Sequence, residues 1–132
     1  MKTLVVAPHP DDELLGCGGT LLNRKSKGAH LGWLIVTGIS QEIGSSLAQV
    51  EQREKEIAHV ASGLGVDRVY NLGLPTTMLD TIPMGEIIKK FSEVFRDFEP
   101  EVVLVPNRGD VHTDHRVVFD AASACCKWFR YP

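Results

Sequence analysis

Residues that commonly bind metal ions follow one another from His9. Prolines stand on both sides of this histidine, and three carboxylates come directly after them: Asp11, Asp12 and Glu13. Imidazole nitrogen and carboxylate oxygen are ligands that Zn²⁺ takes in proteins. Proline fixes its own φ and restricts the residue before it, so the backbone around His9 is held in place. The segment therefore predicts one half of a metal site whose ligands are positioned before the ion binds.

A second run of the same kind lies near the other end of the sequence. It contains two of the five histidines, His112 and His115, with Asp114 between them. Two histidines and one carboxylate form a metal site with three protein ligands, which leaves a position for water. Zn²⁺ lowers the pKa of such a water from about 15.7 to about 7, so the two segments predict hydrolysis at neutral pH.

The adjacent carboxylates Asp11 and Asp12 suggest a division of roles. Neighbouring side chains cannot easily point at the same ion, so one can bind the metal while the other accepts a proton from water as a general base. A simpler alternative makes both residues, with Asp114, helix-capping acids that interact with the helix dipole. The presence of both segments in one chain favours the metal site.

His112 and His115 share one face of a helix if that helix begins at Thr113. One of them can bind the metal, while the other stabilises developing charge or protonates the leaving amine. Asp114 can orient one of the imidazoles through a hydrogen bond. The alternative interpretation is that these are ordinary surface histidines.

The elements that must position these residues alternate between strand and helix. Short apolar runs predict strands at residues 3–7, 31–37, 68–72 and 102–106, and other stretches predict helices at 14–27, 47–64, 85–98 and from near Thr113. This order predicts one α/β domain over residues 1–132, a Rossmann-like three-layer sandwich with a mostly parallel sheet and helices on both faces. Ligands bind beyond the carboxyl ends of such strands. If the first and fourth strands are neighbours, the two candidate segments meet there.

Composition and charge exclude several classes of protein. The formal net charge is −3 and no long Lys/Arg cluster occurs, so we expect no binding to nucleic acid. No apolar run approaches the roughly 18–20 residues of a membrane span, and the first strand follows Met1 without a cleavage site, so we expect a cytoplasmic protein. The three cysteines are an odd number, and Cys125 and Cys126 are adjacent, which predicts reduced thiols.

The two segments together resemble the motifs of the PIG-L/LmbE-like deacetylase family, (A/P)HPDDE and HxDH. Both motifs match, at residues 8–13 and 112–115, and the resemblance covers essentially the whole chain. It implies three zinc ligands: His9, Asp12 and His115. It also implies that Asp11 is the general base that activates water.

The resemblance implies further roles outside the ligand set. His112 would stabilise the tetrahedral intermediate or act as an acid, and Asp114 would tune a neighbouring histidine. Arg53 matches a family arginine that contacts substrate. The implied reaction is hydrolysis of the acetamide of an N-acetylglucosamine-type sugar or conjugate, without an organic cofactor. Zn²⁺ is the expected metal, and Fe²⁺ suits the same ligands.

Two features depart from the family pattern. The chain is shorter than family members, so we expect it to lack a C-terminal portion that helps to build the substrate pocket. Thr76 and Thr77 stand where relatives often place an acidic substrate contact. Apolar residues near the end would then lack intramolecular partners, which predicts self-association or a partner that covers them: Phe119, Trp128, Phe129 and Tyr131.

Three alternative functions stay open on the sequence. A deacylase of a non-sugar amide would keep the same metal site, and a truncated metal-binding scaffold would keep it with little activity. A nucleotide-binding module is the third, because glycines follow the first strand. However, Gly16, Gly18 and Gly19 lack the G-x-G-x-x-G spacing, and the carboxylates of residues 11–13 would lie where phosphates bind.

Overall fold

The computed structural model describes residues 1–10, 12–39 and 44–127, and for residues 12–15 it describes the backbone only. Asp11, the predicted general base, lies outside these ranges. So do Trp128, Phe129 and Tyr131, three of the four apolar residues on which the prediction of self-association rests. The fourth, Phe119, is half-buried.

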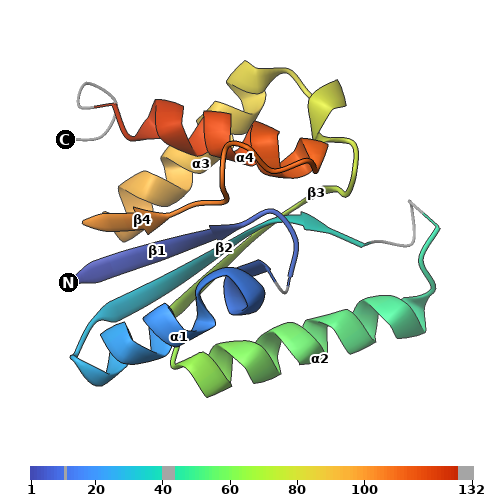
Figure 1. Cartoon of the computed structure of the whole chain (residues 1–132). Coiled ribbons are helices and arrows are strands. Elements are labelled where there is room, and N and C mark those ends of the chain that lie inside the picture. The colour runs from blue at the N-terminus through green and yellow to red at the C-terminus, as the bar shows by residue number, and fades with distance from the viewer. Residues whose placement is uncertain (11, 40–43, 128–132) are drawn as a thin grey trace.

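Within the described ranges, four strands form one parallel sheet in the order β3-β2-β1-β4 (Figure 1). The strands are β1 (Lys2–Ala7), β2 (His30–Gly38), β3 (Arg68–Pro75) and β4 (Val102–Leu104). β1 pairs with β2 on one side, and on the other side it pairs with β4 through Val5↔Leu104. The first and fourth strands are therefore neighbours, which is the arrangement that brings the two candidate segments together.

Helices cover both faces of the sheet, as predicted. α1 (Asp12–Ser26) and α2 (Leu47–Leu64) lie on one face, and α3 (Met84–Phe98) and α4 (Thr113–Cys125) lie on the other (Figure 1). A short 3₁₀ helix, η2 (Leu79–Thr81), connects β3 to α3. None of the helices in the described ranges is long and apolar enough to cross a membrane. The fold is the predicted three-layer α/β sandwich.

Local signals explain where α2 begins and ends. Ser46 forms a capping box with Gln49: the Gln49 N–H donates to Ser46 Oγ at 3.1 Å, and the Ser46 N–H donates to Gln49 Oε1 at 2.8 Å. Gly65 ends the helix with a φ of +72°, a left-handed conformation in which glycine avoids the strain of a side chain. The two caps fix the residues at which α2 begins and ends.

α1 and β4 differ from their predicted ranges for local reasons. α1 begins at Asp12 rather than at Leu14, and it carries a kink at Cys17, where φ is −151° and ψ is 23°. Glycine stands on both sides of the kink, which is the segment that the sequence predicts to be weakly helical. β4 is shorter than the predicted range 102–106, because it ends before Pro106, which has no N–H to donate to a neighbouring strand.

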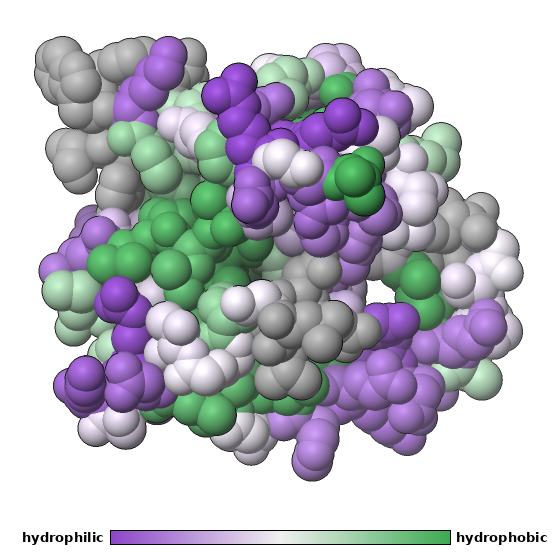
Figure 2. Space-filling view, in the orientation of Figure 1, coloured by the Kyte–Doolittle hydropathy of each residue, from purple (hydrophilic) through white to green (hydrophobic). Residues whose placement is uncertain are grey.

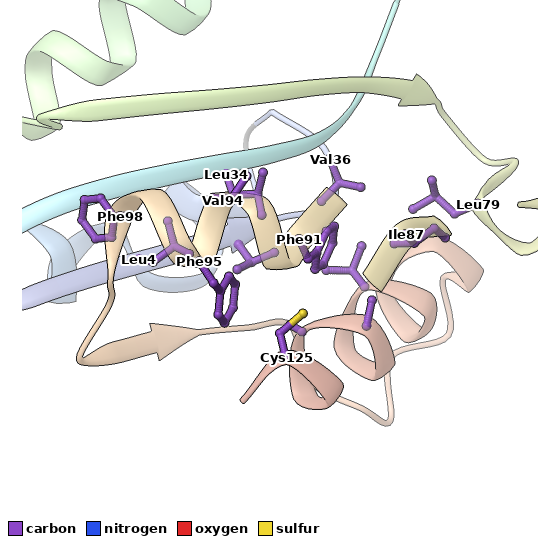
Figure 3. Packing of buried hydrophobic residues seen from close by; sticks show 14 residues of the cluster. Leu4, Leu34, Val36, Leu79, Ile87, Phe91, Val94, Phe95, Phe98 and Cys125 are labelled. Atoms are coloured by element: carbon purple, nitrogen blue, oxygen red, sulfur yellow. The ribbon is translucent and has the colours of Figure 1, made fainter. Parts of the chain in front are cut away.

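Two apolar clusters fill the spaces between the three layers. The first joins Leu4 and Leu34 of the sheet to Phe91 and Phe95 of α3, and it continues to α4 (Figure 3). The second joins neighbouring strand residues, including Val5, to α1 and α2 on the other face. Leu4 and Val5 enter different clusters because successive side chains of a strand point to opposite faces. This alternation explains why successive residues of the central strands β1 and β2 are buried.

The edge strand β4 is more exposed than the two central strands. Figure 2 shows apolar surface gathered over β4. The residues Val102, Val103 and Leu104 are half-buried, and Val105, which follows them, is 37% exposed. β4 therefore leaves one edge of the sheet open beside the segment that carries His112 and His115.

Candidate metal centre and active site

The loops that follow β1 and β4 bring three histidines together. His9 lies two residues after the end of β1, while His112 and His115 lie where the loop after β4 enters α4. The ring centroids of His9 and His112 are 4.7 Å apart, those of His9 and His115 are 5.4 Å apart, and those of His112 and His115 are 5.1 Å apart. The pairing of β1 with β4 causes this convergence, because parallel strands end at the same edge of the sheet.

Asp114 is the most deeply buried polar group of the centre, with 0% of its surface exposed. Its Oδ2 accepts the backbone N–H of Thr77 at 2.6 Å and lies 2.9 Å from His9 Nε2. Its Oδ1 accepts the backbone N–H of Leu79 at 3.3 Å. One carboxylate therefore links α4, the segment after β3 and the histidine after β1.

His112 is the N-cap of α4, and its ring contacts a backbone N–H, whereas the ring of His9 contacts a carboxylate. Its Nδ1 accepts the backbone N–H of Asp114 at 3.1 Å. An N-cap residue satisfies a helical N–H that has no partner within the helix. The alternative prediction made Asp114 the capping residue, but the structure gives that place to His112.

His115 contacts a carboxylate that the sequence analysis did not single out. Its Nδ1 lies 3.0 Å from Asp110 Oδ2, while Asp110 Oδ1 accepts the backbone N–H of His112 at 3.0 Å. The hydrogen bond from His112 is the main reason that the pKa of Asp110 lies below its usual value, and the nearby imidazoles lower it further against a smaller opposing effect of burial. The Asp-x-His spacing, which suits a side chain bonding to the N–H two residues on, is the signal that could have identified Asp110.

Hydrogen bonding divides the three imidazoles into two kinds. A neutral imidazole has one N–H and one nitrogen lone pair, and the partner at one nitrogen determines the state of the other. His9 and His115 each face a carboxylate, which can only accept, so each donates its N–H there and keeps a lone pair on the other nitrogen. His112 accepts a backbone N–H at Nδ1, so its own N–H is at Nε2. Two rings are thus suited to bind a metal, and the third is suited to donate a hydrogen bond.

The donor set fits a divalent metal ion. Among the described side chains, His9, His112 and Asp114 offer potential ligand atoms within 4.8 Å of one another. Two imidazoles on one tetrahedral Zn²⁺ have centroids roughly 5 Å apart, given Zn–N distances of about 2.0–2.1 Å. The three separations of 4.7, 5.4 and 5.1 Å are all close to that value, so the spacing fits one ion and does not by itself select two of the rings. Both oxygens of Asp114 already accept N–H groups, which makes Asp114 better suited to orient His9 than to bind an ion.

The predicted site residues are brought together to different degrees. His9, His112, Asp114 and His115 meet in one place. Asp12 is the first residue of α1, directly after the His9 segment, but its carboxylate is not among the described side chains. Asp11 lies outside the described residues.

A cavity of about 420 Å³ opens beside His9 and extends toward α2. Its walls combine backbone from the end of β2, polar side chains and a few apolar side chains, among them Thr37, Arg53, Asn71 and Thr76. Arg53 is half-buried, and its Nε lies 3.8 Å from Glu56 Oε2. The predicted substrate contact Arg53 therefore lies in the wall of the same cavity as His9.

Three comparisons with known proteins agree on the kind of domain. The sequence pattern of the PIG-L family, GlcNAc-PI de-N-acetylase, matches residues 4–126. A diacetylchitobiose deacetylase from Thermococcus kodakarensis is 31% identical over 124 residues, covering 87% of this chain and 45% of the relative. A 1D-myo-inositol 2-acetamido-2-deoxy-alpha-D-glucopyranoside deacetylase from Mycobacterium sp. (strain KMS) is 30% identical over 143 residues, covering 86% of this chain and 46% of the relative.

Similarity in structure points the same way. The crystal structure of the conserved protein TT1542 from Thermus thermophilus matches with a TM-score of 0.79 at 43% identity, covering 92% of this chain and 53% of that one. The present chain spans about half the length of these relatives. The family pattern nevertheless covers both candidate segments and nearly all the residues between the two ends. The chain belongs to the PIG-L family.

Proposed function

We propose that this chain is a metal-dependent hydrolase that removes the acetyl group from an N-acetylglucosamine-type sugar or conjugate. One observation carries the proposal. The rings of His9 and His115 each have one nitrogen at a carboxylate, and beside them the ring of His112 accepts a backbone N–H. The names of two relatives support the substrate class, since both are deacetylases of acetamido sugars. The relatives are about twice as long as this chain, so the activity is proposed for the chain and is not transferred from them.

The metal in this proposal is Zn²⁺, held by His9, His115 and the carboxylate of Asp12. Such an ion supplies Lewis acidity, which lowers the pKa of water and polarises an amide carbonyl. Fe²⁺ suits the same nitrogen and oxygen donors. Asp114 and Asp110 each accept a hydrogen bond from one ring nitrogen of these histidines and so orient the other nitrogen, as carboxylates do for many metal-binding histidines.

Two further side chains handle protons and developing charge. Asp11 accepts the proton of the attacking water as the general base, and its position beside Asp12 places it next to a ligand without making it one. His112 keeps its N–H at Nε2 because Nδ1 is occupied by the Asp114 N–H. It therefore donates a hydrogen bond to the oxygen that becomes negative. The proton that Asp11 takes from water is the one that passes to the departing amine nitrogen.

The sugar binds in the cavity between His9 and α2. Arg53 lies in its wall and presents donors suited to sugar hydroxyl oxygens. Thr76 lies in the same wall, where relatives often have an acidic contact, so hydroxyl groups replace a carboxylate on this side. We therefore expect weaker orientation of the sugar than in a site with a carboxylate.

Acetate release is the experiment that tests this proposal. Zinc-loaded protein is incubated with N-acetylglucosamine, diacetylchitobiose and a panel of non-sugar acetamides. We expect acetate from the sugars, and a decrease on the order of 10²- to 10⁴-fold for Asp11→Asn with zinc content unchanged. Asp120→Asn, an exchange of the same kind on α4, away from the centre, is the matched control.

Three results would contradict the proposal in different ways. Acetate from non-sugar amides alone would favour a deacylase of another substrate class. Bound zinc without acetate from any compound would favour a metal-binding scaffold. Protein that binds no divalent metal would remove the basis of the site assignment.

A further inference from the structure

We propose that Asp110 is a positioning residue that sets the protonated nitrogen of His115 and thereby makes His115 a metal ligand. The inference rests on the metal centre proposed above and deepens it. It concerns a residue outside both motif segments, and its basis is the contacts of the two carboxylate oxygens.

Each oxygen of Asp110 has a separate partner. Oδ1 accepts the backbone N–H of His112 at 3.0 Å, and Oδ2 lies 3.0 Å from Nδ1 of His115. The side chain of His115 is only 14% exposed and that of Asp110 is 34% exposed, so water competes weakly for the imidazole. The carboxylate thus joins the N-cap residue of α4 to a ring on the first turn of that helix.

The loop before α4 places Asp110 through its own hydrogen bonds. The Asp110 N–H donates to the carbonyl oxygen of Asn107 at 3.1 Å, and Asn107 Oδ1 accepts the N–H of Gly109 at 2.8 Å. These short-range contacts do not involve His115. The loop backbone at Asp110 is therefore held by contacts that are independent of the His115 ring.

A carboxylate is required because both partners are donors. An asparagine has one acceptor oxygen and one NH₂ group, so it cannot offer an acceptor to each partner separately. If the amide oxygen keeps the His112 N–H, the NH₂ group faces Nδ1 of His115. That nitrogen must then accept, the ring proton moves to Nε2, and the lone pair that would bind a metal is lost.

The first test observes the imidazole directly in the metal-free protein. Two-bond ¹H–¹⁵N correlation spectra at about pH 8, where an ordinary imidazole is neutral, report which ring nitrogen carries the proton. We expect Nδ1–H for His115 in the wild type and Nε2–H in Asp110→Asn, with Asp120→Asn unchanged. Nε2–H at His115 in the wild type would overturn the proposal, and so would an unchanged ring in Asp110→Asn.

The second test measures Zn²⁺ affinity by competition with a chromophoric chelator. We expect Asp110→Asn to weaken binding on the order of 10- to 100-fold, the effect that carboxylates behind metal-binding histidines have in other proteins. Asp110→Ser keeps an oxygen for the His112 N–H and removes the partner of His115, so it separates helix capping from ring orientation. Wild-type affinity in Asp110→Ser would overturn the proposal even if Asp110→Asn failed to fold.

The two proposals can fail independently. Wild-type protein that binds Zn²⁺ normally but releases no acetate would contradict the deacetylase and leave the Asp110 prediction supported by its own two readouts. The ring spectra use metal-free protein, so they decide the role of Asp110 in either case.

Discussion

The two ends of the sheet both carry a histidine beside a carboxylate, but they use this pair differently. At the amino end of β2, Nδ1 of the exposed residue His30 lies 3.2 Å from Asp67 Oδ2. The same carboxylate receives Lys25 Nζ at 2.9 Å and the Leu31 N–H at 2.8 Å. In this arrangement Lys25 balances the negative charge of the carboxylate, and the contact links α1 to the sheet. The imidazole is one partner among several.

At the carboxyl end of the sheet, carboxylates contact the imidazoles and fix their orientation. Asp114 contacts the ring of His9, and Asp110 contacts the ring of His115. The centroids of the three histidine rings lie 4.7–5.4 Å apart. Asp114 is completely buried, whereas the side chain of Asp67 is 29% exposed. A histidine beside an aspartate therefore does not identify a site. What distinguishes the carboxyl end is that several imidazoles gather there, each with one nitrogen held by a partner.

The comparison predicts the largest loss of stability at Asp114. Replacing Asp114 by Ala removes the acceptor of the Thr77 and Leu79 N–H groups in a buried place, and we expect the free energy of unfolding to fall by about 3 kcal/mol. Urea denaturation measures the change. A loss smaller than that caused by Asp67→Ala would reverse the proposed order of the two ends.

Gly32 tests the packing of the amino end without touching charge. A Cβ at this position would lie 2.8 Å from Phe98 Cε1 and 3.0 Å from Leu4 Cδ1. Phe98 is buried and its ring also stacks on His30, so it has little room to move. We expect Gly32→Ala to lower the free energy of unfolding by about 1–3 kcal/mol and to leave Zn²⁺ affinity unchanged. Weakened zinc binding would mean that the two ends are coupled, contrary to the separation described above.

Asp67 predicts a smaller effect that depends on pH. Partial burial raises the pKa of Asp67, but the Leu31 N–H and Lys25 outweigh burial, so the pKa is lowered overall. The folded state therefore favours the ionised form. The resulting stabilisation is present above the unfolded pKa of about 3.9 and is lost as the pH falls through the lower folded value.

Asp67→Asn measures that stabilisation. We expect it to lower the free energy of unfolding by about 1 kcal/mol at pH 7, and the difference from wild type should shrink as the solution is acidified below the unfolded pKa. Urea denaturation at a series of pH values provides the measurement. A difference that stays constant to the acid limit would show that the charge of Asp67 is not the cause.

His30 gives the smallest expected effect. Because the ring is exposed and Asp67 has stronger partners, His30→Gln should change the free energy of unfolding by less than about 0.5 kcal/mol. Zinc stoichiometry should stay at the wild-type value. A loss of zinc in this variant would make His30 a ligand at the amino end of β2 and would contradict a metal site at the carboxyl end of the sheet.

The architecture could be predicted from sequence because each layer carries its own signal. The central strands are apolar on both faces, and α2 has a serine cap at its start and Gly65 at its end. The two candidate metal-binding segments were predicted to meet, since both follow strands of a parallel sheet. The kink in α1 and the early end of β4 depend on details of backbone conformation that a run of residue types only suggests.

The hydrogen bonds of the candidate site were harder to predict. Asp114 receives N–H groups from Thr77 and Leu79, which lie 37 and 35 residues earlier in the chain, so its complete burial depends on tertiary contacts. Residue chemistry alone also left open which of His112 and His115 is better suited to bind a metal. The choice depends on whether a carboxylate or a backbone N–H stands behind each ring, which is set by the loop that carries Asp110.

The most direct test compares zinc content and acetate release in His9→Ala, His112→Ala and His115→Ala. We predict about one zinc per chain in the wild type, loss of zinc and of turnover in His9→Ala and His115→Ala, and retained zinc with little turnover in His112→Ala. Loss of zinc from His112→Ala, with zinc retained in His115→Ala, would contradict the account. It would make His112, whose ring accepts a backbone N–H, the ligand in place of His115.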